Sequence, residues 1–145
     1  MAFRHFTYLS DAEGKIEVLM GDGRITMERE LANTGSRKYD VLAIDAFSGD
    51  AVSVYLLTKD AFSLYLKHLK KDGILAMHIS SKYLQLENVI CGITNEFKIG
   101  SLYVKTRKKR KKDISRSTWI LLTNNQQFLS YSKVLKYVTS WPDNL

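Results

Sequence analysis

YDVLAIDAFSGDAVSVYLLTKDAFSLYLKHLKKDGILAMHIS, residues 39–80, is the stretch of sequence that decides the fold. Residues 41–47 are almost continuously apolar, as in a parallel strand buried on both faces, and Asp45 interrupts the run. Residues 74–79 are again mostly apolar and predict a second strand. Ligands of open α/β sheets bind at the carboxyl ends of such strands. Asp45 is therefore the first candidate for a functional residue.

The segment between these two strands carries the signals of an amphipathic helix. Thr58 is a suitable N-cap, and Asp60 places a negative charge in the first turn. The apolar residues that follow have the i, i+3, i+4, i+7 spacing of one helix face: Phe62, Tyr65, Leu66 and Leu69. Lysines precede Gly73, which is a typical helix ending. We predict a helix that starts after Thr58 and runs to about Lys71.

The rest of the chain also alternates strands and helices. We predict further strands at residues 16–20, 102–104 and 118–123, and further helices at residues 25–31, 86–97 and 127–138. The last two strands follow one another without a helix between them, so we expect them to be antiparallel neighbours. This order predicts a single α/β domain over residues 1–145, with a mostly parallel, doubly wound sheet and an antiparallel C-terminal hairpin.

The formal net charge of +7 comes from one run of the sequence. Residues 105–116, KTRKKRKKDISR, hold 8 basic residues and 1 acid, and the rest of the chain holds 14 of each. Such a run attracts nucleic acid or another anion, but a solvated loop between strands often has the same composition. No aromatic residue is interleaved to stack on bases. A noncatalytic module that binds nucleic acid or another anion through residues 105–116 is therefore an alternative function.

Composition also bounds the compartment and the metal chemistry. No apolar run reaches the roughly 18 residues that span a bilayer, and we expect a cytoplasmic protein with no membrane partner. The single cysteine, Cys91, is expected to be a buried thiol. His5, His68 and His78 lack metal-ligand spacing, so no metal site is predicted. We expect His68 to be structural, whereas His78 either faces a ligand cleft or is structural too.

Two segments together resemble the spermidine synthase family of aminopropyltransferases, particularly its bacterial spermidine synthase-like members. These segments are FTYLSDAEGKIEVLMGDGRITMERE, residues 6–30, and residues 39–80. The resemblance rests on a GDGR turn after one strand and a DAF turn after the next, and it covers residues 3–85. It implies an S-adenosylmethionine-methyltransferase-like, Rossmann-like fold. It also implies aminopropyl transfer from decarboxylated S-adenosylmethionine to a polyamine such as putrescine.

The resemblance implies a nucleoside-binding role for the GDGR turn. Asp22 corresponds to the acid that binds the adenine amino group of decarboxylated S-adenosylmethionine or of its product, methylthioadenosine. Gly21 and Gly23 would let the backbone approach the ring, with Ala46 contributing to the same nucleoside site. A plain strand-to-helix turn explains the two glycines equally well. We expect these nucleosides to be exchanging ligands and no tightly bound cofactor.

Asp45 corresponds to the base that deprotonates the attacking amine. An alkylammonium group has a pKa of about 10, and it cannot attack the carbon beside a sulfonium until its proton is taken. The alternative for Asp45 is a buried carboxylate bonded to the backbone of its own turn. The family's second polyamine-binding acid is replaced by Ser48, and Asp50 lies close by. Ser48 and Asp50 are therefore the substrate-binding candidates.

The sequence departs from the family by an absence. It holds no glycine-rich cofactor loop, and only 15 residues precede the predicted strand at residues 16–20. We therefore expect a truncated, incomplete site that is inactive as this chain alone. Either the strand at residues 16–20 pairs directly with the strand at 41–47, or another chain, such as a second copy, completes the sheet. An S-adenosylmethionine-dependent methyltransferase is the other alternative function.

Overall fold

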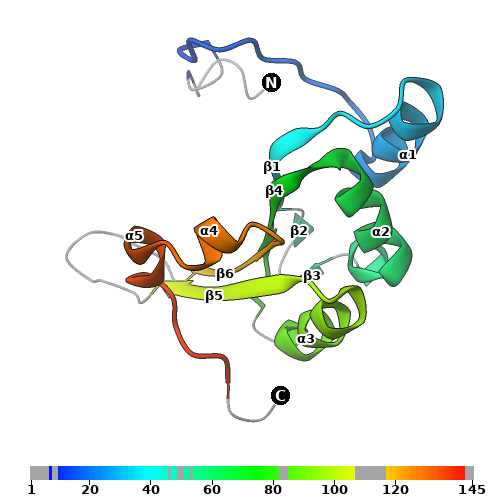
Figure 1. Ribbon diagram of the computed structural model, residues 1–145. Coiled ribbons are helices and arrows are strands. Elements are labelled where there is room, and N and C mark those ends of the chain that lie inside the picture. Colours follow the sequence, from blue (N-terminus) through cyan, green and yellow to red (C-terminus); the bar gives the residue numbers. More distant parts are fainter. Residues whose placement is uncertain are drawn as a thin grey trace.

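The computed structural model describes residues 7, 10–45, 47–48, 51–52, 54–81, 85–106 and 117–142, with the backbone alone at 47–48 and 51–52. The main sheet consists of β1 (Tyr39–Ile44), β4 (Leu69–His78), β5 (Gly100–Thr106) and β6 (Ser117–Thr123). Three longer helices are α1 (Gly23–Asn33), α2 (Lys59–His68) and α3 (Leu86–Phe97). The smaller elements are β2 (Phe47–Ser48), β3 (Ala51–Val52), η2 (Val54–Leu57), α4 (Gln126–Leu129) and α5 (Ser132–Leu135). Figure 1 shows their arrangement.

The strand order of the sheet is β1-β4-β6-β5. β1 and β4 are parallel, while β6 is antiparallel to both β4 and β5. Hence β1, β4 and β5 run in one direction, and β6 returns between β4 and β5. This arrangement confirms the predicted α/β fold with a mostly parallel sheet and an antiparallel C-terminal hairpin.

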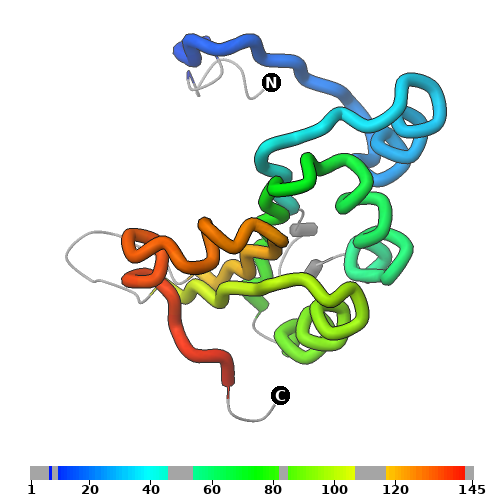
Figure 2. The backbone as a smooth tube through the Cα atoms, viewed as in Figure 1, coloured from blue at the N-terminus to red at the C-terminus, as the bar shows by residue number. Residues whose placement is uncertain are grey.

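The core lies between one face of the sheet and the helices α2 and α3. Alternate residues of the strands point into it, as the two-residue period of a strand requires. In Figure 2 the helices α1, α2 and α3 follow one another along one side of the sheet, and α4 lies against β5. The largest fully buried core side chains are Phe62, Tyr65, Leu75, Met77, Ile79, Ile90, Tyr103, Ile120 and Leu122.

His68 is structural, as predicted. Its side chain is fully buried at the end of α2, and its Nδ1 atom accepts a hydrogen bond from the Arg37 backbone N–H at 3.3 Å. Nε2 therefore carries the proton and donates to the Met27 carbonyl at 2.9 Å. Both ring nitrogens are satisfied, so the imidazole ties α1 and the segment before β1 to α2.

The predicted strand at residues 16–20 is wrong. These residues form no regular secondary structure and pair with no strand of the described part of the chain, and their apolar side chains are exposed, up to 90% at Met20. Within the described residues β1 pairs only with β4, so direct pairing of residues 16–20 with β1 is wrong as well. Apolar composition can favour an extended backbone, but a strand also needs a neighbour for its N–H and C=O groups.

The boundaries of two helices also differ from the prediction. The helix expected at residues 127–138 is split into α4 and α5. The Ser130 hydroxyl donates to the carbonyl of Gln126 at 2.8 Å, a local bond that competes with the helix ladder. α2 ends at His68 rather than near Lys71, because Leu69 turns to extended backbone and starts β4.

Several large apolar side chains of the described residues are exposed. Part of the apolar surface lies on β1, where Val41 is 57% exposed, and on the segment at residues 16–20. An edge strand of this kind is a site for pairing with another chain. Completion of the sheet by a second copy therefore stays a prediction.

Gly73 permits the close approach of β1 and β4. The register between these strands shifts after the Tyr39–Leu69 pair, and a Cβ atom at Gly73 would lie 2.8 Å from the Tyr39 carbonyl oxygen. We predict that Gly73→Ala lowers the free energy of unfolding by about 1–3 kcal/mol. Gly92→Ala, where a Cβ meets nothing within 4 Å, should raise it by about 0.5–1 kcal/mol because α3 gains helix propensity. Urea unfolding of both variants checks this, and equal changes would contradict it.

If a second copy covers the outer edge of β1, a charge on that edge should separate the copies. Sedimentation should give a species heavier than the 16.6 kDa monomer, and Val41→Lys should shift it to the monomer. Val89→Lys is the matched control, because Val89 is exposed on α3, away from this edge. A wild-type chain that sediments as a monomer at 100-fold different concentrations, from about 1 to 100 µM, would rule out the second copy.

Candidate functional site

Asp45 follows the last residue of β1, at the carboxyl end of the parallel pair. The register pairs Ile44 with Met77, so the next residues along the two strands, Asp45 and His78, come side by side. The Asp45 side chain is 54% exposed, and its Oδ1 atom lies 2.7 Å from Nδ1 of His78. Asp45 is therefore not a carboxylate buried in its own turn, since about half of its side chain is exposed.

His78 is held from several directions. Its Nε2 atom lies 2.7 Å from the Ser80 hydroxyl, and its ring stacks on Trp119 at a centroid distance of 4.7 Å and an interplanar angle of 12°. Trp119 is in this position because the antiparallel register pairs it with His78 across β4 and β6. The sequence left open whether His78 faces a cleft, and it did not predict the bond to Asp45.

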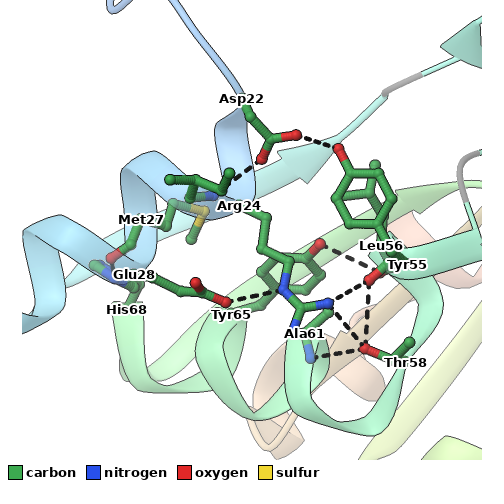
Figure 3. A network of polar contacts seen from close by, with 11 residues as sticks. Asp22, Arg24, Met27, Glu28, Tyr55, Leu56, Thr58, Ala61, Tyr65 and His68 are labelled. Carbon is green, nitrogen blue, oxygen red and sulfur yellow. Dashed lines mark hydrogen bonds and ion pairs between the residues drawn. The ribbon is translucent and has the colours of Figure 1, made fainter.

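Asp22 is the N-cap of α1. One carboxylate oxygen accepts the Ile25 backbone N–H at 3.0 Å, and the other accepts the hydroxyl of Tyr55 (Figure 3). These bonds, first that of Tyr55 and then that of Ile25, lower the pKa of Asp22 below its ordinary value. Gly21 precedes the cap with a φ of +129°, a conformation that favours glycine, and Gly23 is the first residue of α1.

Arg24 connects α1 to the segment that leads into α2. Its Nη1 atom donates to the Tyr55 carbonyl at 2.6 Å and to the Thr58 hydroxyl at 3.2 Å, while Nε donates to Glu28 at 2.9 Å (Figure 3). Thr58 also caps α2 by accepting the Ala61 N–H, as predicted. Arg24 and Tyr55 therefore fix the geometry around Asp22. Arg24 stands in the GDGR turn, but nothing in the sequence signals Tyr55.

A cleft of about 390 Å³ lies between α1, β1 and the η2–α2 segment. Asp45, Arg24 and Tyr55 all line it, which brings the end of β1 and the first turn of α1 to one cavity. Burial raises the pKa of Tyr65, another lining residue, to about 12, so its hydroxyl is neutral and donates to the Leu56 carbonyl at 3.2 Å. The remaining lining side chains are largely apolar, including Leu19, Met27, Leu42 and Ile44.

Several predicted site residues lie outside the described part of the chain. Ala46 and Asp50 are among them, and of Ser48 only the backbone is described, in β2. Residues 107–116 of the basic run also lie outside it, while Lys105 and Thr106 end β5. Among the described residues, no group of three or more His, Cys, Asp or Glu side chains is arranged to hold a metal ion. No helix in that part combines the length and apolar character needed to cross a bilayer.

The strand order and crossovers define a Rossmann-like fold of the kind found in S-adenosylmethionine-dependent methyltransferases. Comparison with solved structures agrees. The crystal structure of spermidine synthase from Thermotoga maritima matches with a TM-score of 0.59 over 97% of this chain, at 12% identity. The match spans 48% of that protein's chain, and identity this low shows a common fold alone. No family model and no curated protein sequence matches the chain.

Removal of the Tyr55 hydroxyl tests how the pKa of Asp22 is lowered. This hydroxyl is the largest cause of the lowered pKa, so Tyr55→Phe should raise the pKa of Asp22 toward its ordinary value. A carboxylate with a lowered folded-state pKa stabilises the fold above its unfolded pKa, and this contribution is lost as pH falls through the folded pKa. The variant should therefore lose less stability than wild type in that acidic window. Carboxyl ¹³C NMR titration measures the shift.

The control is Tyr137→Phe, which removes an exposed hydroxyl from a side chain outside the Asp22 network and should leave the titration unchanged. An Asp22 pKa that does not move in Tyr55→Phe would mean that the N-cap alone sets it.

Proposed function

We propose that this chain carries the amine-activating part of a spermidine synthase-like aminopropyl-transfer site. The observation that carries the proposal is the position of Asp45, half-exposed at the carboxyl end of a parallel strand and lining a cleft. In open α/β sheets this is where ligands bind. The Rossmann-like fold and the structural match to a spermidine synthase support the assignment at the level of the fold.

In the proposed reaction Asp45 accepts a proton from the alkylammonium group of a polyamine. The free amine attacks the aminopropyl carbon beside the sulfonium of decarboxylated S-adenosylmethionine. The new C–N bond forms as the C–S bond breaks, the sulfur keeps the bonding pair, and methylthioadenosine leaves. A carboxylate also attracts the cation before the proton moves, and holding the two reactants together supplies part of the acceleration.

The cleft suits a nucleoside in size and lining. Its 390 Å³ lies within the roughly 300–1,000 Å³ of small-molecule sites, and its lining is mostly apolar with a few polar groups. Asp22 is not among the residues that line this cleft, but it precedes Gly23 and accepts the hydroxyl of Tyr55, and both of these residues line it. We propose that Asp22 contacts the adenine amino group. Its Oδ2 atom already accepts the Tyr55 hydroxyl, but each carboxylate oxygen can accept two hydrogen bonds. The nucleoside would thus share Asp22 with Tyr55.

The proposed site needs groups that the described residues do not supply. The sequence holds no glycine-rich loop for the methionine-derived part of the ligand, and the match covers 48% of the spermidine synthase chain. We propose that another chain completes the site beside β1, whose outer edge has no partner among the described residues. Turnover by this chain alone is therefore not expected, and binding is the property to measure.

Calorimetry can test the two halves of the site separately. Wild type should bind methylthioadenosine at submillimolar concentration, and Asp22→Ala should weaken this by about tenfold, the effect of losing one charge-assisted hydrogen bond. Asp45→Asn should leave methylthioadenosine binding unchanged and abolish the binding of putrescine to the methylthioadenosine complex.

Asp72→Asn makes the same chemical change at an exposed acid that does not line the cleft, and it should alter neither affinity. No heat from millimolar methylthioadenosine would contradict the proposal. Binding of S-adenosylmethionine without any response to putrescine would favour a methyltransferase instead.

A further inference from the structure

A chain of hydrogen bonds runs from the sheet backbone to Asp45. The Thr118 backbone N–H donates to the Ser80 hydroxyl oxygen at 2.7 Å. That hydroxyl lies 2.7 Å from Nε2 of His78, and Nδ1 of His78 lies 2.7 Å from Oδ1 of Asp45. His78 is the last residue of β4, and Ser80 follows that strand. Thr118 lies in the neighbouring strand β6, and Asp45 follows β1 on the other side of β4.

The chemistry of the groups assigns the protons along this chain. A carboxylate can only accept, so Nδ1 of His78 must carry the hydrogen that lies between it and Asp45. In the neutral ring Nε2 is then an acceptor, and the Ser80 hydroxyl donates a hydrogen bond to it. The Ser80 oxygen accepts in turn from Thr118. Each group in the chain thereby donates a hydrogen bond to the next one, from the Thr118 backbone N–H to the Asp45 carboxylate.

The imidazole is also fixed in orientation. Its face stacks on Trp119, and its side chain is 20% exposed, so it has little freedom to rotate away. An exposed ion pair between flexible side chains contributes little because ordering both groups costs entropy. His78 differs, since both nitrogens and one ring face are already engaged before any ligand arrives.

We infer that His78 is a positioning residue for Asp45, an inference that rests on the proposed amine-activating role of Asp45. The Nδ1–H bond fixes Oδ1 and orients the carboxylate so that Oδ2 meets the ammonium group of the polyamine. Among the described residues, this bond is the only one made to the Asp45 carboxylate. A preorganised carboxylate needs no rearrangement when the amine binds, which favours both binding and proton transfer.

The same three side chains could in principle activate Ser80 as a nucleophile, as in a Ser-His-Asp arrangement. Two observations oppose this. The Ser80 oxygen accepts a strand N–H, which holds it to the sheet, and neither Ser80 nor His78 lines the cleft that contains Asp45. The hydroxyl is thus better placed to hold His78 than to attack a carbonyl carbon.

The first test needs no ligand. Nitrogen-15 NMR of the imidazole at pH 8 reports which ring nitrogen is protonated. We expect Nδ1 of His78 to carry a proton, and Asp45→Asn to change its signal more than Asp72→Asn does. An unprotonated Nδ1 in the wild-type protein would overturn the inference, whether or not the protein binds nucleosides or amines.

The second test compares two variants of nearly equal shape. His78→Asn keeps an N–H donor near the position of Nδ1, whereas His78→Leu removes it, and both lose the stack on Trp119. We expect His78→Leu to weaken putrescine binding to the methylthioadenosine complex by about tenfold relative to His78→Asn, with methylthioadenosine affinity unchanged. Circular dichroism checks that both variants fold.

The outcomes separate the inference from the proposed function. Equal putrescine affinities in the two variants would overturn the positioning role of His78. They would leave the proposed amine-activating role of Asp45 unaffected. Absence of putrescine binding in wild type would contradict the proposed function, and the NMR result would then decide alone whether His78 holds Asp45. Covalent labelling of Ser80 by a fluorophosphonate, lost in His78→Leu, would overturn the inference by showing a serine nucleophile.

Discussion

The parallel pairing of β1 with β4 is the interaction on which the rest of the structure depends. A parallel pair needs a crossover, and α2 supplies it while burying Phe62 and Tyr65 against the sheet. The register then sets which side chains meet at the carboxyl ends of the strands. A slip of one residue would turn each side chain of β1 to the opposite face and separate Asp45 from His78. Core packing and site geometry therefore follow from one register.

Much of this could be predicted from local sequence signals, because strand and helix periods, the Thr58 cap and the position of Asp45 depend on near neighbours in the chain. The pairing of Asp45 with His78 could not be predicted, since it depends on a register that shifts near Gly73 across 33 residues of chain. The Tyr55 bond to Asp22 spans a similar separation. The strand predicted at residues 16–20 is wrong for the opposite reason. The local pattern of these residues suits a strand, but the described part of the chain offers them no partner strand.

The two acids singled out by the sequence have different physical settings. Both oxygens of Asp22 are used by the protein, one for the α1 cap and one for Tyr55, and these bonds keep its pKa low. Asp22 would therefore contribute to the fold even without a ligand. Asp45 is held on one side by His78 and is otherwise half-exposed. The fold therefore orients the Asp45 carboxylate and still leaves it half-exposed. Such a carboxylate is suited to chemistry on an incoming amine.

The open edge of the sheet and the candidate site are one region of the molecule. β1 has no partner on its outer side among the described residues, and Asp45 is the residue that follows β1. A parallel strand added to that edge would end beside Asp45 and would place its own following loop against the cleft. The same addition would cover Val41, which is exposed on β1. Burial of the edge and completion of the site would thus be a single event, so the hydrophobic gain from association would also organise the groups around the amine.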